Sequence, residues 1–281
     1  MNVKLKNSIK TLVRSYYDYQ NERLALDGRL EMKKDGSAKK DAKPSDEILL
    51  VSLYERRNGI REFELKLEKE MATEVHKHDL WKTYLCNVKG IGEVLAAVII
   101  SEFDIYKAPH VSNLWSFAGV ATGEKNGRKI VKTKNPESYN PRQGHVVDRK
   151  KNCVIVEIDE KVRIDKKTPG YMRPYNQFLR DKLCGVLGGS FLKSNSPYRE
   201  FYDNMKHRLE SENWGTASKN PTDLKRPKAG HQHKAATRYM IKMFLKDLYV
   251  AWRTLEGLVV SEPYQKKYLG HDHEKNHPKS A

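Results

Sequence analysis

The feature that most constrains the fold is a pair of helical seams in residues 1–80, in which apolar residues recur mainly at intervals of three or four positions. The first seam is interrupted at Arg23 and consists of Leu5, Ile9, Leu12, Tyr16, Tyr19, Leu26 and Leu30. The second consists of Leu49, Leu53, Ile60, Phe63, Leu67, Met71 and Val75. Because a short polar linker, residues 33–44, joins them, we expect an antiparallel coiled-coil hairpin or a coiled coil with another copy of the chain. The alternative is that part of the seam packs on the downstream domain.

The balance of charge points to a polyanionic partner. Among 281 residues, 53 Lys and Arg against 36 Asp and Glu give a formal net charge of +17. Such an excess concentrates nucleic acid near the protein, although a charged surface also serves solubility. The longest apolar run, Val94 to Ile100, is far shorter than the roughly 20 residues of a membrane helix. The N-terminus shows no secretion signal and three cysteines lack CxxC spacing, so we expect a reduced cytoplasmic protein without a membrane partner.

A glycine-cornered turn between two apolar segments is the most informative local pattern. It comprises Lys89, Gly90, Ile91, Gly92 and Glu93, and a helix of small and apolar residues follows it to Phe103. This is the pattern of a helix-hairpin-helix, in which glycines let a phosphate approach the free amides at a helix N-terminus. The alternative is that the two glycines only end one helix and allow close packing with the next.

The remaining chain divides into a basic insertion, further helices and a tail. Residues 122–170 alternate short apolar runs with Gly and Pro, which predicts a partly β, basic insertion carrying Arg128, Lys129 and Lys132. Helical spacing returns near Phe178, and a last helix is expected over residues 234–256. The expected domains are therefore a coiled-coil hairpin (1–80), a helix-hairpin-helix domain (81–260) and a flexible tail (261–281). The fold class is mainly α.

No catalytic or metal site is evident from the residues alone. The histidines at 231, 233, 271, 273 and 277 lack nearby cysteine ligands, so we predict no metal site and no cofactor. Asp104, Asp148, Asp159 and Asp165 are not placed together by any pattern. Hydroxyl side chains such as Thr122 have no paired base in the sequence.

Four segments in order resemble a known family of mobile-element recombinases. They are VKGIGEVLAAVIISEFDIYKAPHVSNLWSFAGVA, RPYNQFLRDKLCGVLGG, SPYREFYDNMKHRL and HKAATRYMIKMFLKDLYVAW. Over residues 81–255 they are similar to the C-terminal domain of Piv-type DNA invertases and IS-one-ten class insertion-sequence transposases. The matching residues are Gly90, Gly92, Ala118, Gly119, Asn176, Leu179, Arg180, Ala235 and Arg238.

The chain also departs from that family. The family's N-terminal RuvC-like domain, with its DEDD carboxylates, has no counterpart here. Thr122-Gly123 stands where the family carries a nucleophilic Ser-Gly pair, and Lys89 replaces the proline before the hairpin. The resemblance therefore implies Thr122 as a candidate nucleophile, and Mg²⁺ only if a partner chain supplies carboxylates.

From these observations we expect a DNA-binding protein, acting in or derived from DNA recombination or transposition, without complete catalytic machinery. DNA contacts are expected from Lys89, the amides of Gly90 to Glu93, Arg128, Lys129, Lys132, Arg180 and Arg238. The coiled coil would make a homo-oligomer. One alternative is a divergent transposase or recombinase with an active site shared with another chain. A second is a coiled-coil interaction protein with a non-catalytic domain that binds structured RNA or protein.

Overall fold

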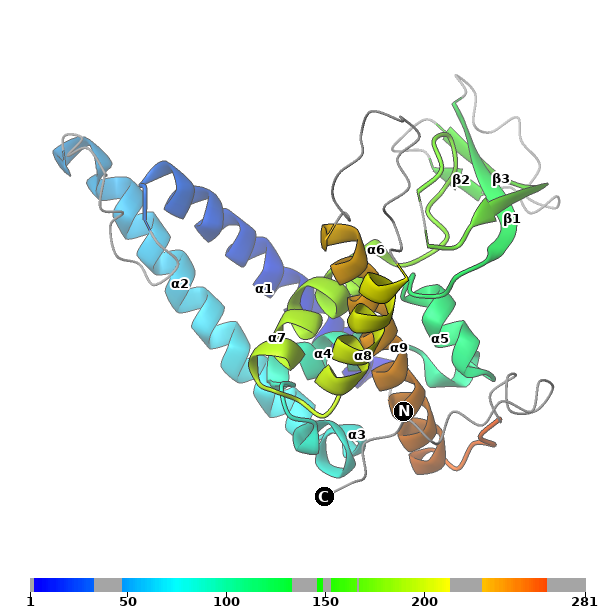
Figure 1. Cartoon of the computed structure of the whole chain (residues 1–281). Helices are drawn as coiled ribbons and strands as arrows, with labels where there is room; N and C mark the ends of the chain where they lie inside the picture. The colour runs from blue at the N-terminus through cyan, green and yellow to red at the C-terminus, as the bar shows by residue number, and fades with distance from the viewer. Residues whose placement is uncertain are drawn as a thin grey trace. The chain divides into compact units, whose positions relative to one another are not determined.

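The computed structural model describes residues 3–32, 47–132, 146–148, 153–165, 167–212 and 229–261. Over these residues the chain is mainly helical with a small three-stranded antiparallel sheet, which confirms that part of the expected fold class (Figure 1). Among them, no helix combines the length and apolar character needed to cross a bilayer. The expected linker and nearly all of the expected tail lie outside the described residues.

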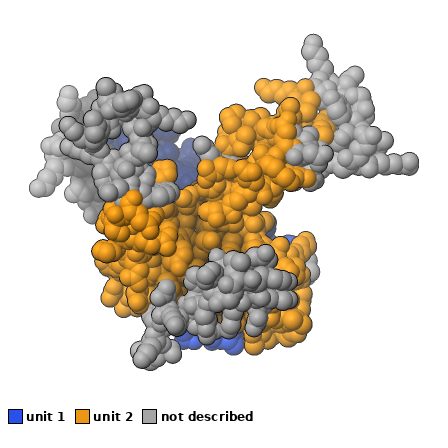
Figure 2. Space-filling view, turned by 45° about the vertical axis from the view of Figure 1, so that its right-hand side comes forward, with its two compact units in different colours: residues 1–87, 91–103 blue, residues 88–90, 104–281 orange. Residues whose placement is uncertain are grey.

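The chain divides into two compact units (Figure 2). Unit 1 comprises residues 1–87 and 91–103, and unit 2 comprises residues 88–90 and 104–281. The domain limits expected near residues 80 and 260 stay predictions.

Unit 1 is built on two long helices, α1 (Val3–Arg29) and α2 (Glu47–His76), which lie side by side in Figure 1. They run antiparallel, because Tyr16 of α1 bonds Glu68 of α2 while Asp27, further along α1, bonds the earlier Arg57. Fully buried apolar side chains of this pair include Ile9, Val13, Met71 and Val75. Most of these belong to the expected seams, whose local spacing predicted the helices.

The interruption of the first seam at Arg23 has a structural cause. Arg23 is buried and its Nε donates to Oε1 of the fully buried Glu64 over 2.7 Å.

Two residues of the expected seams do not face inward. Tyr19 and Phe63 are 36 % and 55 % exposed and stack on each other. A helix of 3.6 residues per turn drifts away from a 3.5-residue seam, so some seam residues turn outward.

The short helix α3 (Asp79–Thr83) and α4 (Glu93–Glu102) complete unit 1. Leu95 to Glu102 are all buried, as expected for a helix that is apolar all round. The far end of α4 is fixed to α1 by an ion pair between Arg14 and Glu102 and by a 2.6 Å hydrogen bond from Lys6 Nζ to the carbonyl of Phe103.

Unit 2 is a helical body with a small sheet. Its elements are α5 (Val111–Phe117), β1 (Glu124–Lys132), β2 (Val146–Asp148), β3 (Cys153–Arg163), α6 (Gln177–Arg180), a π-helical turn (Asp181–Leu187), α7 (Gly188–Lys193), α8 (Arg199–Ser211) and α9 (Ala229–Leu255). The strands pair antiparallel in the order β1-β3-β2, with a bulge at Asn126/Gly127. Helix α9 supplies much of the core through Met240, Ile241, Phe244, Leu245, Leu248 and Trp252.

Candidate nucleic-acid interface

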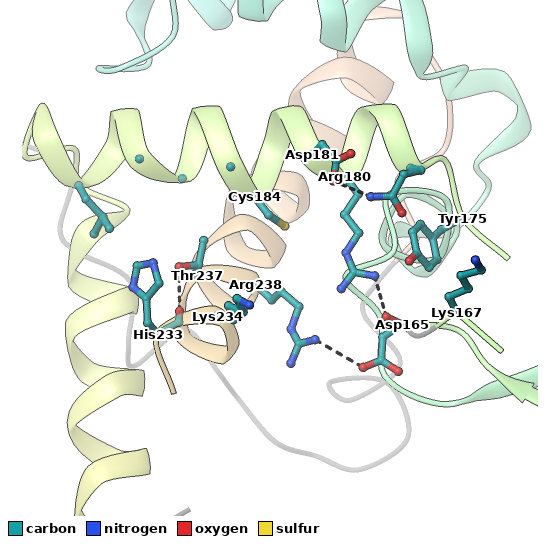
Figure 3. Close-up of a pocket in the computed structure, with 15 residues that line it drawn as sticks. Asp165, Lys167, Tyr175, Arg180, Asp181, Cys184, His233, Lys234, Thr237 and Arg238 are labelled. Atoms are coloured by element: carbon teal, nitrogen blue, oxygen red, sulfur yellow. Dashed lines mark hydrogen bonds and ion pairs between the residues drawn. The ribbon is translucent and has the colours of Figure 1, made fainter. Parts of the chain in front are cut away.

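A cavity of about 710 Å³ lies within unit 2 (Figure 3). Its walls come from the segment after β3, from α6 with the π-helical turn, and from α7 and α9. The charged residues among its described lining are Asp165, Lys167, Arg180, Asp181, Lys234 and Arg238. Four cationic side chains therefore face two carboxylates, which favours an anionic occupant.

Arg180 lies on α6, which begins at a capping residue and runs directly into the π-helical turn. The side-chain oxygen of Asn176 accepts from the amide of Leu179 over 3.1 Å, so α6 begins there. The helix then widens into the π-helical turn, a local form that recurs at functional sites. Gly188 follows, and a Cβ there would come within 2.7 Å of the Thr237 methyl carbon, so glycine lets α7 approach α9 closely.

Arg180 is held by a carbonyl and an aromatic ring. Its Nη1 donates to the backbone oxygen of Asp165 over 2.6 Å, and its guanidinium lies 4.7 Å from the centre of the Tyr175 ring. Gly119 packs closely against both Tyr175 and Arg180. A Cβ added at Gly119 would lie 2.6 Å from the Tyr175 ring and 3.1 Å from the Arg180 side chain. Neither the carbonyl nor the ring neutralises the full charge of Arg180.

Asp165 is the shared anchor of two further arginines. Its carboxylate accepts two 3.0 Å hydrogen bonds from Arg163 and a longer one, 3.5 Å, from Arg238. Arg180 and Arg238 thus converge on Asp165 from α6 and α9, as Figure 3 shows. Burial acts to raise the pKa of Asp165, but the hydrogen bonds and charge of Arg163 and the charge of Arg238 outweigh it and lower the pKa.

Two other lining residues are a cysteine and a histidine. Burial raises the pKa of the Cys184 thiol to about 11, against the opposing charges of Arg180 and Arg238, so the nucleophilic thiolate is disfavoured at neutral pH. His233 lies at the end of the cavity away from Asp165 in Figure 3, and its Nδ1 lies 2.7 Å from the hydroxyl of Tyr202. Both side chains help to shape the cavity.

The structure brings together two of the cations expected to bind DNA and places the others elsewhere. Arg180 and Arg238 both line the cavity. Arg128, Lys129 and Lys132 are exposed along β1, where Lys129 also pairs with Tyr171 through the backbone. Thr122 is exposed on the segment before β1 and is not among the described residues that line the cavity.

The glycine-cornered turn has two differently placed glycines. Gly90, in unit 2, accepts a 2.6 Å hydrogen bond at its carbonyl from Ser190, and a Cβ there would lie 2.8 Å from the Ser194 hydroxyl. Gly90 therefore packs closely against Ser190 and Ser194. In unit 1, Gly92 caps α4, and a Cβ added to it would meet no described atom within 4 Å. Lys89 is exposed.

The turn's remaining residues add little positive charge. Ile91 is buried. Glu93 lies in the first turn of α4, with its carboxylate 3.5 Å from the imidazole of His76. A carboxylate at this place competes with an external anion for the helix N-terminus, so any phosphate contact must come from the amides rather than from this side chain.

Sequence reasoning missed Lys167, Lys234 and the anchor formed by Arg163 and Asp165. One signal was available: Lys234 precedes Arg238 by one helical turn, so both lie on the same face of α9. Within the described residues, no cluster of three or more potential metal ligands occurs.

Comparison with protein-family models, with curated proteins and with solved structures finds no match to this chain. The resemblance to mobile-element recombinases therefore stays a hypothesis.

Proposed function

We propose that this chain is a DNA-binding protein whose unit 2 contacts the sugar–phosphate backbone through the cavity cations, with Arg180 and Arg238 at the centre. The observation that carries the proposal is their meeting in one cavity from distant parts of the sequence. In this proposal the protein acts in, or derives from, DNA recombination of mobile elements and lacks complete catalytic machinery.

The pairing of these arginines leaves charge for a phosphate. The carboxylate of Asp165 already accepts two hydrogen bonds from Arg163. Its 3.5 Å contact with Arg238 is longer and weaker, so it neutralises the charge of Arg238 only in part. Arg180 contacts a carbonyl and a ring instead. Guanidinium groups with several remaining N–H donors suit phosphate oxygens, which accept paired hydrogen bonds.

The arrangement of the resembling motifs supports the same proposal. Gly119 packs against the Arg180 side chain, Asn176 caps the helix of Arg180, and Arg238 projects from α9 toward the same anchor. Residues of three motifs that lie apart in the sequence thus come together near Arg180 and Asp165 in unit 2. This is consistent with the family resemblance.

Further contacts are proposed for the expected cations outside the cavity. Arg128, Lys129 and Lys132 on the exposed strand β1 would hold further phosphates, and Lys89 and the amides beside Gly92 would each hold others. Contacts of this kind fix position along the nucleic acid without specifying sequence. We further propose that α1 and α2 form a coiled coil through which two copies associate.

The test is the salt dependence of DNA binding. Each phosphate contact contributes about 0.9 to the slope of log K against log salt for duplex DNA. We expect Arg238→Gln and Arg180→Gln each to weaken binding of labelled duplex DNA in fluorescence anisotropy, and to reduce that slope by about 0.9.

Arg208→Gln is the matched control. Arg208 lies on α8 of the same unit, its side chain is 63 % exposed, and it pairs with Glu212. The control removes the same charge outside the described cavity lining, so its effect should be much smaller. Equal losses in all three variants would mean that net charge, and not this cavity, binds DNA.

A further inference from the structure

We propose that the cavity of unit 2 receives an unpaired nucleotide, from a single strand or a strand end, rather than the flank of a duplex. This rests on the proposed function and specifies its ligand. The inference follows from the position of the cations, the volume of the cavity and the residues that form its two walls.

The central cations are recessed. Arg180 and Arg238 converge on Asp165, which is only 8 % exposed, and the Arg238 side chain is 25 % exposed. The phosphates of a duplex lie on the outside of a stiff, convex cylinder, so a duplex can bring a phosphate to the mouth of the cavity but cannot place a whole nucleotide inside it. An unpaired strand bends at each nucleotide and can place one phosphate there, as in enzymes that draw a nucleotide out of the stack.

The size of the hollow fits one nucleotide. Its volume of about 710 Å³ lies within the range of roughly 300 to 1,000 Å³ that encloses drug-sized ligands. A mononucleotide is such a ligand. The cavity therefore has room for a phosphate together with its sugar and base.

The two walls of the cavity differ in chemistry: one carries positive charge that suits a phosphate, and the other exposes backbone that suits a base or a sugar. Lys234 and Arg238 are one turn apart on α9 and present adjacent positive groups for a phosphate. The opposite wall includes Gly185 and Gly189, where an added Cβ would meet no atom of the described residues within 4 Å. A wall of bare backbone lets a flat base or a sugar approach closely.

The test fills the cavity without changing its charge. Gly189→Leu adds a side chain where the structure has open space, and Gly28→Leu adds the same side chain at an exposed position of α1 that is equally open. The probes are a labelled oligothymidine and a blunt duplex of the same length, measured by anisotropy with the full chain.

We expect the unaltered protein to bind the single strand more tightly than the duplex at equal salt. Gly189→Leu should weaken single-strand binding by about tenfold or more, corresponding to loss of about 1.4 kcal/mol, and change duplex binding by less than about twofold. Gly28→Leu should change neither. If Gly189→Leu weakens both probes equally, or neither, the inference is overturned.

A second measurement uses the unaltered protein, so it does not depend on the variant folding. Thymidine 5′-monophosphate should displace the single strand at concentrations that leave the duplex bound. Failure of that competition removes the nucleotide pocket. If Arg238→Gln weakens duplex binding while filling the cavity changes nothing, the proposed function stands and this inference alone falls. Absence of binding to either probe refutes both.

Discussion

Replacing Glu64 by alanine should weaken unit 1 more than any exposed charge change in the same helices. Glu64 is fully buried on α2 and accepts hydrogen bonds from Arg23 over 2.7 Å and from Arg61 over 2.8 Å. Arg23 also bonds Asp27, which in turn bonds Arg57. The five side chains form one ionic network between α1 and α2.

The magnitude follows from the exposure of each partner. Arg61 is 40 % exposed, so water replaces Glu64 there at a cost of at most about 1 kcal/mol. Without Glu64, the buried Arg23 would have only Asp27 of the two carboxylates it now pairs with, and Asp27 also pairs with Arg57. Breaking a buried pair from one side costs about 3 to 5 kcal/mol. We expect a loss near the lower end, about 3 kcal/mol, because Asp27 remains.

Hydrogen exchange of the α1 and α2 amides measures this loss without assuming that the two units unfold together. A change of about 3 kcal/mol predicts exchange faster by about a factor of 100 in Glu64→Ala. Arg56→Ala is the matched control, because its pair with Glu22 is solvent-exposed and should cost less than about 1 kcal/mol. If exchange in the two variants is accelerated equally, the ionic network does not hold the helices together.

Three further outcomes are expected. Gly119→Ala should lower the free energy of unfolding, measured by urea titration, by about 2 kcal/mol, because φ at Gly119 is +68° and the new Cβ would meet the Tyr175 ring at 2.6 Å. Gly257→Ala is the control and should cost less, because φ is similar at +65° but an added Cβ would meet no described atom within 4 Å. Because the pKa of Asp165 is lowered in the folded protein, its ionised carboxylate stabilises the fold above the unfolded pKa of about 3.9, and this stabilisation is lost as the pH falls through the lower folded pKa. Asp165→Asn lacks this titrating group. Its urea midpoint should therefore fall less steeply in acid than that of the parent chain. Gly92→Val combined with Lys89→Glu should weaken duplex binding by about tenfold with an unchanged circular dichroism spectrum, and unaltered affinity would remove the glycine-cornered turn from the interface.

The helices of unit 1 could be predicted because their signal is local. Apolar spacing along a single segment determines which face is buried, and Ile9 and Met71 of the two seams are indeed fully buried. The partner of Arg23 could not be predicted in the same way, since Glu64 lies on another helix and the pairing depends on how the two helices are aligned. The outward position of Phe63 has the same origin.

The cavity could be predicted only in part. Arg180 and Arg238 were identified through the family resemblance, but nothing in the sequence brings both to Asp165, where Arg180 contacts the backbone carbonyl and Arg238 the carboxylate. The anchor at Asp165 follows a strand of a basic insertion, and its arginine partners come from three different elements. The π-helical turn has no sequence period of its own, so Gly188 and its close approach to α9 appear only in the structure.

Asp165 should affect stability and phosphate binding in opposite directions. Its charge holds Arg163 and Arg238, yet it also repels any phosphate that enters the cavity. At a separation of about 7 Å and an effective dielectric constant of about 20, that repulsion is about 2 kcal/mol before solvent and salt reduce it. Asn keeps a carbonyl oxygen that can accept from one arginine.

We therefore expect Asp165→Asn to bind single-stranded DNA several-fold more tightly than the parent chain while being less stable at neutral pH. Anisotropy at fixed salt and urea unfolding of the same preparations measure the two effects. Weaker binding would contradict this reasoning, because it would mean that Asp165 contributes more by holding Arg238 in place than it costs by repelling the ligand. Since Arg163 makes two hydrogen bonds to this carboxylate and Arg238 makes one longer bond, the balance favours repulsion.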